Sequence, residues 1–221
     1  MSAQTNGNSH SENANRAMMG GLTNPVFQSQ KIFRAVMNAM ARPGTIHALA
    51  VDAQPPAPMM PLTAGLLATL ADADTPLWLG EQMSASKALT DWLTFHVGAP
   101  FAAEPLDAAF AILPGDAGRL ALDIFSKGVQ DYPDRSATLI IEVESLSHKA
   151  DWFLSGPGIR HHQAFSVSGL SPLFLSQWQE NQKLFPRGVD VIFVEEGAIA
   201  CMPRTTAISL SAPNCAKDEE R

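Results

Sequence analysis

Residues 185–206 constrain the fold of this chain more than any other segment. Two apolar stretches flank a polar turn at residues 195–197, whose glycine can adopt a positive φ angle. This pattern predicts a β-hairpin. Folding the hairpin about Glu196 places Arg187, nine residues before it, almost opposite Arg204, eight residues after it. Residues directly opposite one another in an antiparallel pair lie about 5 Å apart, so we expect both arginines at one end of the hairpin.

The neighbours of these arginines indicate an anion-binding site. Thr205 and Thr206 directly follow Arg204, and a proline precedes each arginine. Two guanidinium groups with adjacent hydroxyl donors suit a phosphate or phosphonate oxyanion. Alternatively, Asp190 or the acidic C-terminal tail neutralises the arginines at a surface or an interface. The residues leave both interpretations open, because two like charges brought together require a negative partner in either case.

Arg42 and His96 are further candidates. Arg42 stands in a Pro-Gly turn after a predicted helix, where the helix dipole alone already favours a cation. His96 closes another predicted helix and can serve as an acid or base, or as a structural cap. The adjacent pair His161-His162 has no cysteine or carboxylate at ligand spacing, so we predict no metal site.

Charge and cysteine usage narrow the class of protein. A net charge of −7 argues against a nucleic-acid-binding protein, which needs a basic stripe. Cys201 falls in a predicted buried strand and Cys215 in a polar tail, so we expect both to be unpaired, as is usual in a reducing cytoplasm. Residues 1–24 lack the apolar centre of a signal peptide, and no apolar run reaches the roughly 20 residues that span a bilayer. We therefore expect a soluble cytoplasmic protein.

Helical and strand patterns alternate along the chain, which predicts one α/β domain with a mixed sheet. The helices are expected at residues 25–40, 62–71, 84 or 86 to 97, 119–125 and 172–182. Besides the hairpin, the strands are expected at residues 45–49, 77–79, 108–113, 137–143, 150–154 and 207–210. The strand at 150–154 is expected to return antiparallel to 137–143. The apolar face of the first helix is expected at Phe33, Val36, Met37 and Met40.

The predicted domain spans residues 25–210. Residues 1–24 are expected to be a disordered extension, because they are polar and lack periodicity, and residues 211–221 a flexible tail. The sequence has no phosphate-binding Gly-Lys-Ser or Gly-Lys-Thr loop, no Gly-x-Gly-x-x-Gly fingerprint, no Gly-x-Ser-x-Gly elbow and no iron–sulfur cysteine cluster. Taken alone, the residues predict an arginine-lined anion site without a catalytic apparatus.

Six segments together carry a family resemblance: Phe33-Arg34 with Met40-Ala41-Arg42-Pro43-Gly44, residues 70–79, Phe95-His96-Val97-Gly98-Ala99-Pro100, Gly156-Pro157-Gly158-Ile159, Phe185-Pro186-Arg187-Gly188-Val189-Asp190 and Pro203-Arg204-Thr205-Thr206. In this order and spacing they resemble the H-subunit family of the bacterial carbon–phosphorus lyase system. The likeness runs from about residue 25 to residue 206.

The resemblance implies a role in phosphonate catabolism. Together with G, I and L subunits, such a protein converts ATP and an alkylphosphonate to ribose 1-alkylphosphonate 5-triphosphate and adenine. It implies a core complex with G, I and J subunits, docking chiefly on I, and a homodimer when the chain is alone. It also implies a three-layer fold like the large domain of pyridoxal-phosphate-dependent transferases, with no cofactor in this chain and ATP as a substrate of the complex. No catalytic residue is carried over.

The residues and the resemblance together leave three candidate functions. The first is an accessory subunit that contacts phosphonate or triphosphate through Arg187 and Arg204. The second is a purely structural subunit whose arginines meet acidic residues of a partner. The third is a free-standing pyridoxal-phosphate transferase, which requires a Schiff-base lysine. Its candidates have no recognisable setting for that chemistry: Lys31, Lys87, Lys127, Lys149, Lys183 and Lys217.

Overall fold

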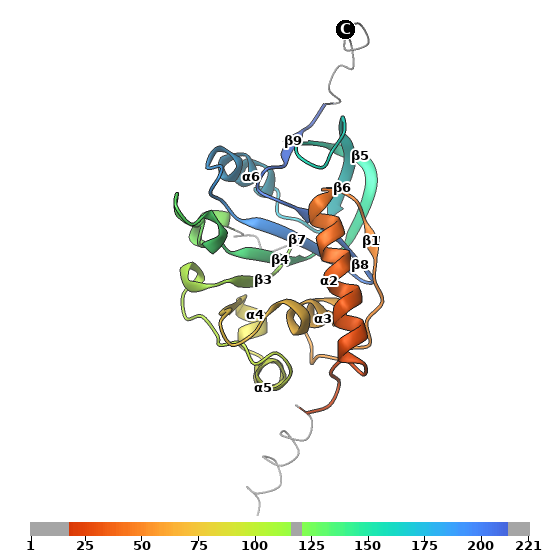
Figure 1. Ribbon diagram of the computed structural model, residues 1–221, viewed down its shortest axis with the longest axis vertical. Coiled ribbons are helices and arrows are strands. Elements are labelled where there is room, and N and C mark those ends of the chain that lie inside the picture. The colour runs from red at the N-terminus through yellow and green to blue at the C-terminus, as the bar shows by residue number, and fades with distance from the viewer. Residues whose placement is uncertain (1–17, 116–120, 212–221) are drawn as a thin grey trace, which may run out of the picture.

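The centre of the molecule is a six-stranded mixed sheet (Figure 1). The computed structural model describes residues 18–115 and 121–211. Across the sheet the strand order is β1 (His47–Ala48), β8 (Ala198–Met202), β7 (Asp190–Glu195), β4 (Thr138–Glu142), β3 (Phe110–Pro114) and β2 (Leu77–Leu79). Strands β2, β3, β4 and β7 run parallel, while β8 and β1 are antiparallel to their neighbours. The predicted α/β class with a mixed sheet is confirmed.

The predicted β-hairpin forms the β7–β8 pair. Its turn contains Gly197 with a φ angle of 83°, as a short hairpin turn of this type requires. The ladder runs from Glu195 opposite Ala198 to Val191 opposite Met202. Because β7 also pairs with β4, the hairpin is part of the sheet and both of its faces are buried.

Helices α2 (Pro25–Ala41), α3 (Pro61–Leu70), α4 (Glu81–Ser84) and α5 (Lys87–His96) contribute to the hydrophobic cluster on one face of the sheet (Figure 1). Asn24 caps α2 by accepting a hydrogen bond from the Phe27 N–H, and Pro25 occupies the first turn of the helix. Helix α3 is apolar around most of its circumference and is largely buried. The short helix α4 was not predicted. Within the described ranges, no helix combines the length and hydropathy needed to cross a bilayer.

The apolar face that the spacing predicts for α2 is buried only in part, since Val36 is buried and Met40 packs against the core, but the other two predicted residues are not buried. Ile32 and Val36 enter the core, whereas Phe33 and Met37 are exposed to solvent. The small residue Gly65 lets α3 approach closely, and a Cβ atom there would lie 3.2 Å from Ile32 Cδ1. The closest neighbour of the helix, rather than its largest side chains, therefore sets which face is buried.

The opposite face of the sheet is covered by helix α6 (Phe174–Lys183) and by a second, three-stranded antiparallel sheet. In that sheet β5 (Ser145–Ser155) lies between β6 (Gln163–Ser168) and β9 (Ala207–Ser209). Phe174 and Trp178 stack with ring planes 14° apart, and Phe174 also contacts Phe193 of the central sheet. Three 3₁₀ turns complete the fold: η1 (Pro105–Asp107), η2 (Leu122–Ile124) and η3 (Pro133–Arg135).

The prediction that residues 150–154 return antiparallel to β4 is wrong. Both edges of β4 are already hydrogen-bonded, to β3 and to β7, so a third strand has no edge to join. The chain instead leaves the central sheet, and β5 pairs with β6 and β9. Strand β6 is not among the strands that the sequence pattern predicts. Where a helix is expected at residues 119–125, the structure has the 3₁₀ turn η2 at residues 122–124, and residues 119–120 lie outside the described part.

Glu142 is a buried acid at the carboxyl end of the central strand β4, with 8% of its surface exposed. The Met60 N–H, at the start of α3, donates a 2.8 Å hydrogen bond to its Oε1. Burial raises the pKa of Glu142, and this hydrogen bond and the nearby Thr63 hydroxyl oppose the rise. The Thr63 Oγ1 itself forms no hydrogen bond of standard geometry. Glu142 thus joins the sheet to the start of α3.

Replacing Glu142 with glutamine tests this burial. Because the pKa of Glu142 is raised in the folded state, folding favours the protonated carboxyl group. The stability that this group contributes is fully present below about pH 4, and it is lost as the pH rises through the folded pKa. Glu142→Gln should therefore gain stability relative to the parent between about pH 4 and pH 8. Urea unfolding across this range measures the difference, with the exposed Glu144→Gln as the control. A difference that does not change with pH would contradict the assignment.

Candidate functional site

Arg204 lies just past the end of β8, at the amino-terminal edge of the parallel strands. Its side chain forms an ion pair with Asp190 at the start of β7. Its Nη1 donates to the carbonyl oxygens of Pro133, at 2.7 Å, and Pro186, at 3.4 Å, and its Nη2 also donates to Ser136 Oγ. A guanidinium group has five N–H donors, and these contacts occupy all of them. Arg204 therefore has no free donor for an external anion in this arrangement.

Arg187 lies at the same end of the hairpin but in different surroundings. It is exposed, and it makes no ion pair within the described ranges. Its backbone is positioned by a turn, since its N–H donates to the Leu184 carbonyl, and the next residue, Gly188, donates to the Lys127 carbonyl. The Arg204 guanidinium reaches the carbonyl oxygen of Pro186, directly before Arg187, so both arginines stand at the same end of the hairpin. Asp190 neutralises Arg204, and Arg187 remains available at the surface.

The backbone of Thr205 and Thr206 contacts helix α6 and the turn after β5. Thr206 is buried, and its carbonyl oxygen accepts a 2.8 Å hydrogen bond from Trp178 Nε1 of α6. Its hydroxyl group is buried without a hydrogen-bond partner among the described residues. The Thr205 carbonyl oxygen packs closely against Gly156, since a Cβ atom at Gly156 would lie only 2.8 Å from it. Both residues therefore serve the packing between α6 and the second sheet.

Arg42 lies in the turn after α2, where the Gly44 N–H donates to the Cys201 carbonyl of β8, whereas His96 lies at the end of α5. Arg42 is exposed after the end of α2, and its carbonyl oxygen accepts hydrogen bonds from the backbone and the hydroxyl group of Thr45. The His96 ring packs on Trp92, with centroids 4.4 Å apart, and a Cβ atom on Gly21 would lie 2.5 Å from its Nδ1. The six predicted site residues are therefore not brought together in one site.

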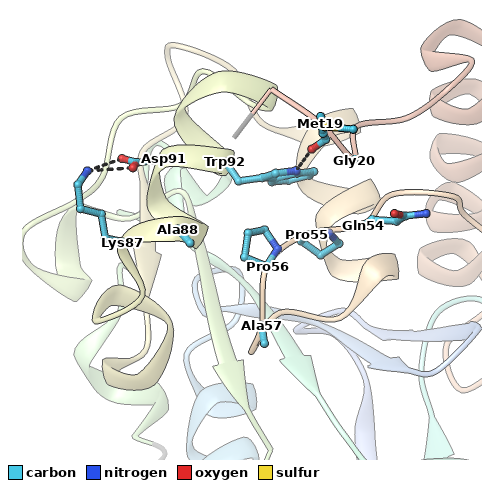
Figure 2. A pocket seen from close by; sticks show the side chains of 10 residues that line it. All are labelled: Met19, Gly20, Gln54, Pro55, Pro56, Ala57, Lys87, Ala88, Asp91 and Trp92. Carbon is cyan, nitrogen blue, oxygen red and sulfur yellow. Dashed lines mark hydrogen bonds and ion pairs between the residues drawn. The ribbon is translucent and has the colours of Figure 1, made fainter. Parts of the chain in front are cut away.

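A cavity of about 560 Å³ lies between three segments that are distant in sequence (Figure 2). Figure 2 shows the Trp92 indole beside Met19, whose carbonyl oxygen accepts a 3.0 Å hydrogen bond from Trp92 Nε1, with Pro55 and Pro56 below the ring in this view. The two charged side chains of the lining, Lys87 and Asp91, pair with one another. No single segment signals this cavity, which sequence reasoning missed, and the two charged side chains of its lining neutralise one another.

The described part of the chain contains no group of three His, Cys, Asp or Glu side chains that could hold a metal ion. His161 and His162 are both exposed, and His162 packs edge-on against Phe153. Burial and the negative charge of Asp190 raise the pKa of the Cys201 thiol, which keeps it protonated and unreactive. Cys215 lies outside the described residues.

Removing the Arg204 side chain should destabilise the protein. Arg204→Ala leaves the Asp190 carboxylate without its partner in a largely buried position, so we expect the free energy of unfolding to fall by about 2–4 kcal/mol. Arg204→Lys should recover only part of this loss, because an ammonium group cannot reproduce the forked contacts. Urea unfolding measures both variants. Arg187→Ala is the control and should change stability by less than about 0.5 kcal/mol; equal losses for both arginines would contradict this division of roles.

Comparison with known proteins places this geometry in a family. The family described as bacterial phosphonate metabolism protein (PhnH) matches residues 20–209. The chain is 39% identical over 189 residues to an alpha-D-ribose 1-methylphosphonate 5-triphosphate synthase subunit PhnH from Rhizobium meliloti (strain 1021), covering 86% of this chain and 94% of the relative. It is 33% identical over 183 residues to a putative C-P lyase subunit protein HtxG from Stutzerimonas stutzeri, covering 83% and 87%. The chain therefore belongs to the PhnH family of bacterial phosphonate metabolism proteins.

Proposed function

We propose that this chain is an accessory subunit of the carbon–phosphorus lyase system. In this role it acts with G, I and L subunits, which convert ATP and an alkylphosphonate to ribose 1-alkylphosphonate 5-triphosphate and adenine. The observation that carries the proposal is the family match over residues 20–209, supported by two relatives whose names describe them as subunits. Similarity along nearly the whole length of both relatives favours the same role.

The proposal includes the partners and the setting of the chain. The partners are the G, I, J and L subunits, with I as the main docking partner, and the chain forms a homodimer when it is alone. The protein works in the cytoplasm and holds no cofactor of its own, with ATP as a substrate of the complex. A likeness of its α/β fold to the large domain of pyridoxal-phosphate-dependent transferases belongs to the same proposal.

The amino-terminal edge of the sheet supports an accessory role more than a catalytic one. Arg204 uses its donors within the chain, which leaves Arg187 as the arginine available at this edge. Phe185 beside it is 62% exposed, and the Arg135 guanidinium lies over the Tyr132 ring, 4.2 Å from its centroid. A surface of exposed aromatic rings and arginines is typical of protein interfaces, where these residue types are enriched.

A pyridoxal-phosphate transferase is less well supported. A Schiff-base lysine requires a pocket that desolvates the amine or places it beside another cation. Lys31, Lys87, Lys149 and Lys183 are exposed, and Lys127 is half-buried. Lys87 and Lys183 are each paired with a carboxylate on their own helix. Lys217 lies outside the described residues. An absorbance band of bound pyridoxal phosphate in the purified protein would favour this alternative.

Reversing the charge of Arg187 tests the role of this edge. Arg187→Glu should lower the fraction of the chain that co-purifies with co-expressed G, I, J and L subunits by about tenfold, because a repulsive group replaces an exposed interface cation. Arg160→Glu, at another exposed arginine, is the matched control. Native mass measurement gives assembly, and growth on methylphosphonate gives function.

The two readouts separate the competing roles of Arg187. Lost assembly supports an interface contact, whereas normal assembly with lost growth indicates binding of phosphonate or triphosphate. If Arg187→Glu preserves both assembly and growth, Arg187 has neither role. If the parent chain itself does not join the co-expressed subunits, the proposed function is wrong.

A further inference from the structure

Helix α2 presents an apolar stripe to solvent. Val26, Phe33 and Met37 follow a spacing of seven and four residues, so they lie along one side of the helix. Their exposed fractions are 73%, 50% and 53%. Phe27, one residue after Val26, is also largely exposed. We call Val26, Phe33 and Met37 the α2 stripe, and Phe27 lies beside it.

The α2 stripe lies outside the hydrophobic core that the described residues form. Helix α2 packs against α3 and β8 (Figure 1) through its other side, where Ile32 and Val36 are buried. Large apolar side chains gathered on one helix face, rather than scattered singly, mark an interaction surface. The spacing is also that of a helix which lays its apolar side into a groove of another protein.

The charges of α2 indicate what kind of surface covers it. The protein has a net charge of −7, yet the 17 residues of α2 include no aspartate or glutamate. Lys31 and Arg34 are exposed on the helix, Arg42 follows its end, and none of the three forms an ion pair within the described ranges. The exposed side of α2 is therefore apolar and positively charged on an otherwise acidic molecule.

A second copy of the chain is a poor occupant for this surface. Packing α2 against α2 of another copy would bring Lys31 and Arg34 of one copy close to the same residues of the other, and the helix carries no carboxylate that could pair with them. Like charges brought together at an interface oppose association. An apolar groove rimmed by carboxylates on a different protein matches both the stripe and the charges.

We propose that α2 docks into an apolar, acid-rimmed groove of a different subunit of the complex. This inference rests on the proposed function and adds the surface and the chemistry of the partner. The stripe supplies the buried contacts, while Lys31 and Arg34 meet carboxylates at the rim. The docking surface lies on the helical layer and is separate from the edge that carries Arg187.

Two double variants test the surface. Phe33→Gln with Met37→Gln removes apolar contacts while keeping good helix formers, and Lys31→Glu with Arg34→Glu reverses the rim charges. Each should weaken assembly with co-expressed G, I, J and L subunits at least about tenfold by native mass measurement. The charge variant should also lose most of the salt dependence of assembly. Because these side chains are exposed, the melting temperatures should match the parent.

Matched controls are available on other surfaces. Leu106→Gln with Leu173→Gln replaces two exposed leucines outside the helix, and Lys149→Glu with Arg160→Glu reverses two exposed cations elsewhere. Both control variants should assemble as the parent does. A loss in the controls equal to the loss in the α2 variants would overturn the assignment to α2.

The remaining outcomes separate this inference from the proposed function. Failure of the parent chain to assemble would overturn both. Normal assembly of the parent and of both α2 variants would overturn the docking surface alone. If the α2 variants assembled normally but lost self-association, measured on the chain alone, a second copy would be the occupant. If the parent bound anionic lipid vesicles, and the α2 variants assembled normally but no longer bound these vesicles, a membrane surface would be the occupant.

Discussion

The contact between Arg204 and Asp190 holds the central sheet together at its amino-terminal edge. It joins the residue after β8 to the first residue of β7, and through Ser136 and Pro133 it also reaches the segment that leads into β4. A guanidinium group suits this position because its forked donors can serve a carboxylate, a hydroxyl group and carbonyl oxygens at the same time. The β7–β8 hairpin and the more distant strand β4 are thereby held together at one edge, and the turn that carries Arg187 is held beside them.

The ion pair with Asp190 gives Arg204 a structural role and leaves other exposed side chains to contact partners. Two arginines at one end of a hairpin suggest an anion site, but an arginine whose donors are all satisfied within the chain contributes to stability instead. What remains for partners lies on two separate surfaces, the turn with Arg187 and the exposed side of α2. An accessory subunit in a larger assembly needs such surfaces more than it needs a pocket with acid–base chemistry, and the two charged side chains that line the cavity beside Trp92 neutralise one another.

The parts of the fold that depend on local spacing could be predicted from the sequence. The hairpin around Gly197, the short strand β2 and the buried helix α3 all occur where the pattern places them. The partner of β5 could not be predicted, because strand pairing depends on which edges are free and not on the pattern of one strand. Phe33 and Met37 are exposed although the spacing predicts them on the buried face of α2, because the packing of α3 at Gly65 decides which side of the helix is buried.

The sequence by itself determined the α/β class, the family and the place of the two arginines at one end of the hairpin, since each of these follows from short-range pattern or from motif order. Only the tertiary structure decided which arginine pairs with Asp190. That outcome depends on Ser136 and Pro133, some 70 residues before Arg204. Contacts over such distances leave no periodic signal in the sequence. The same holds for the exposure of Phe33 and Met37, because burial is a property of what packs against a helix and not of the helix alone.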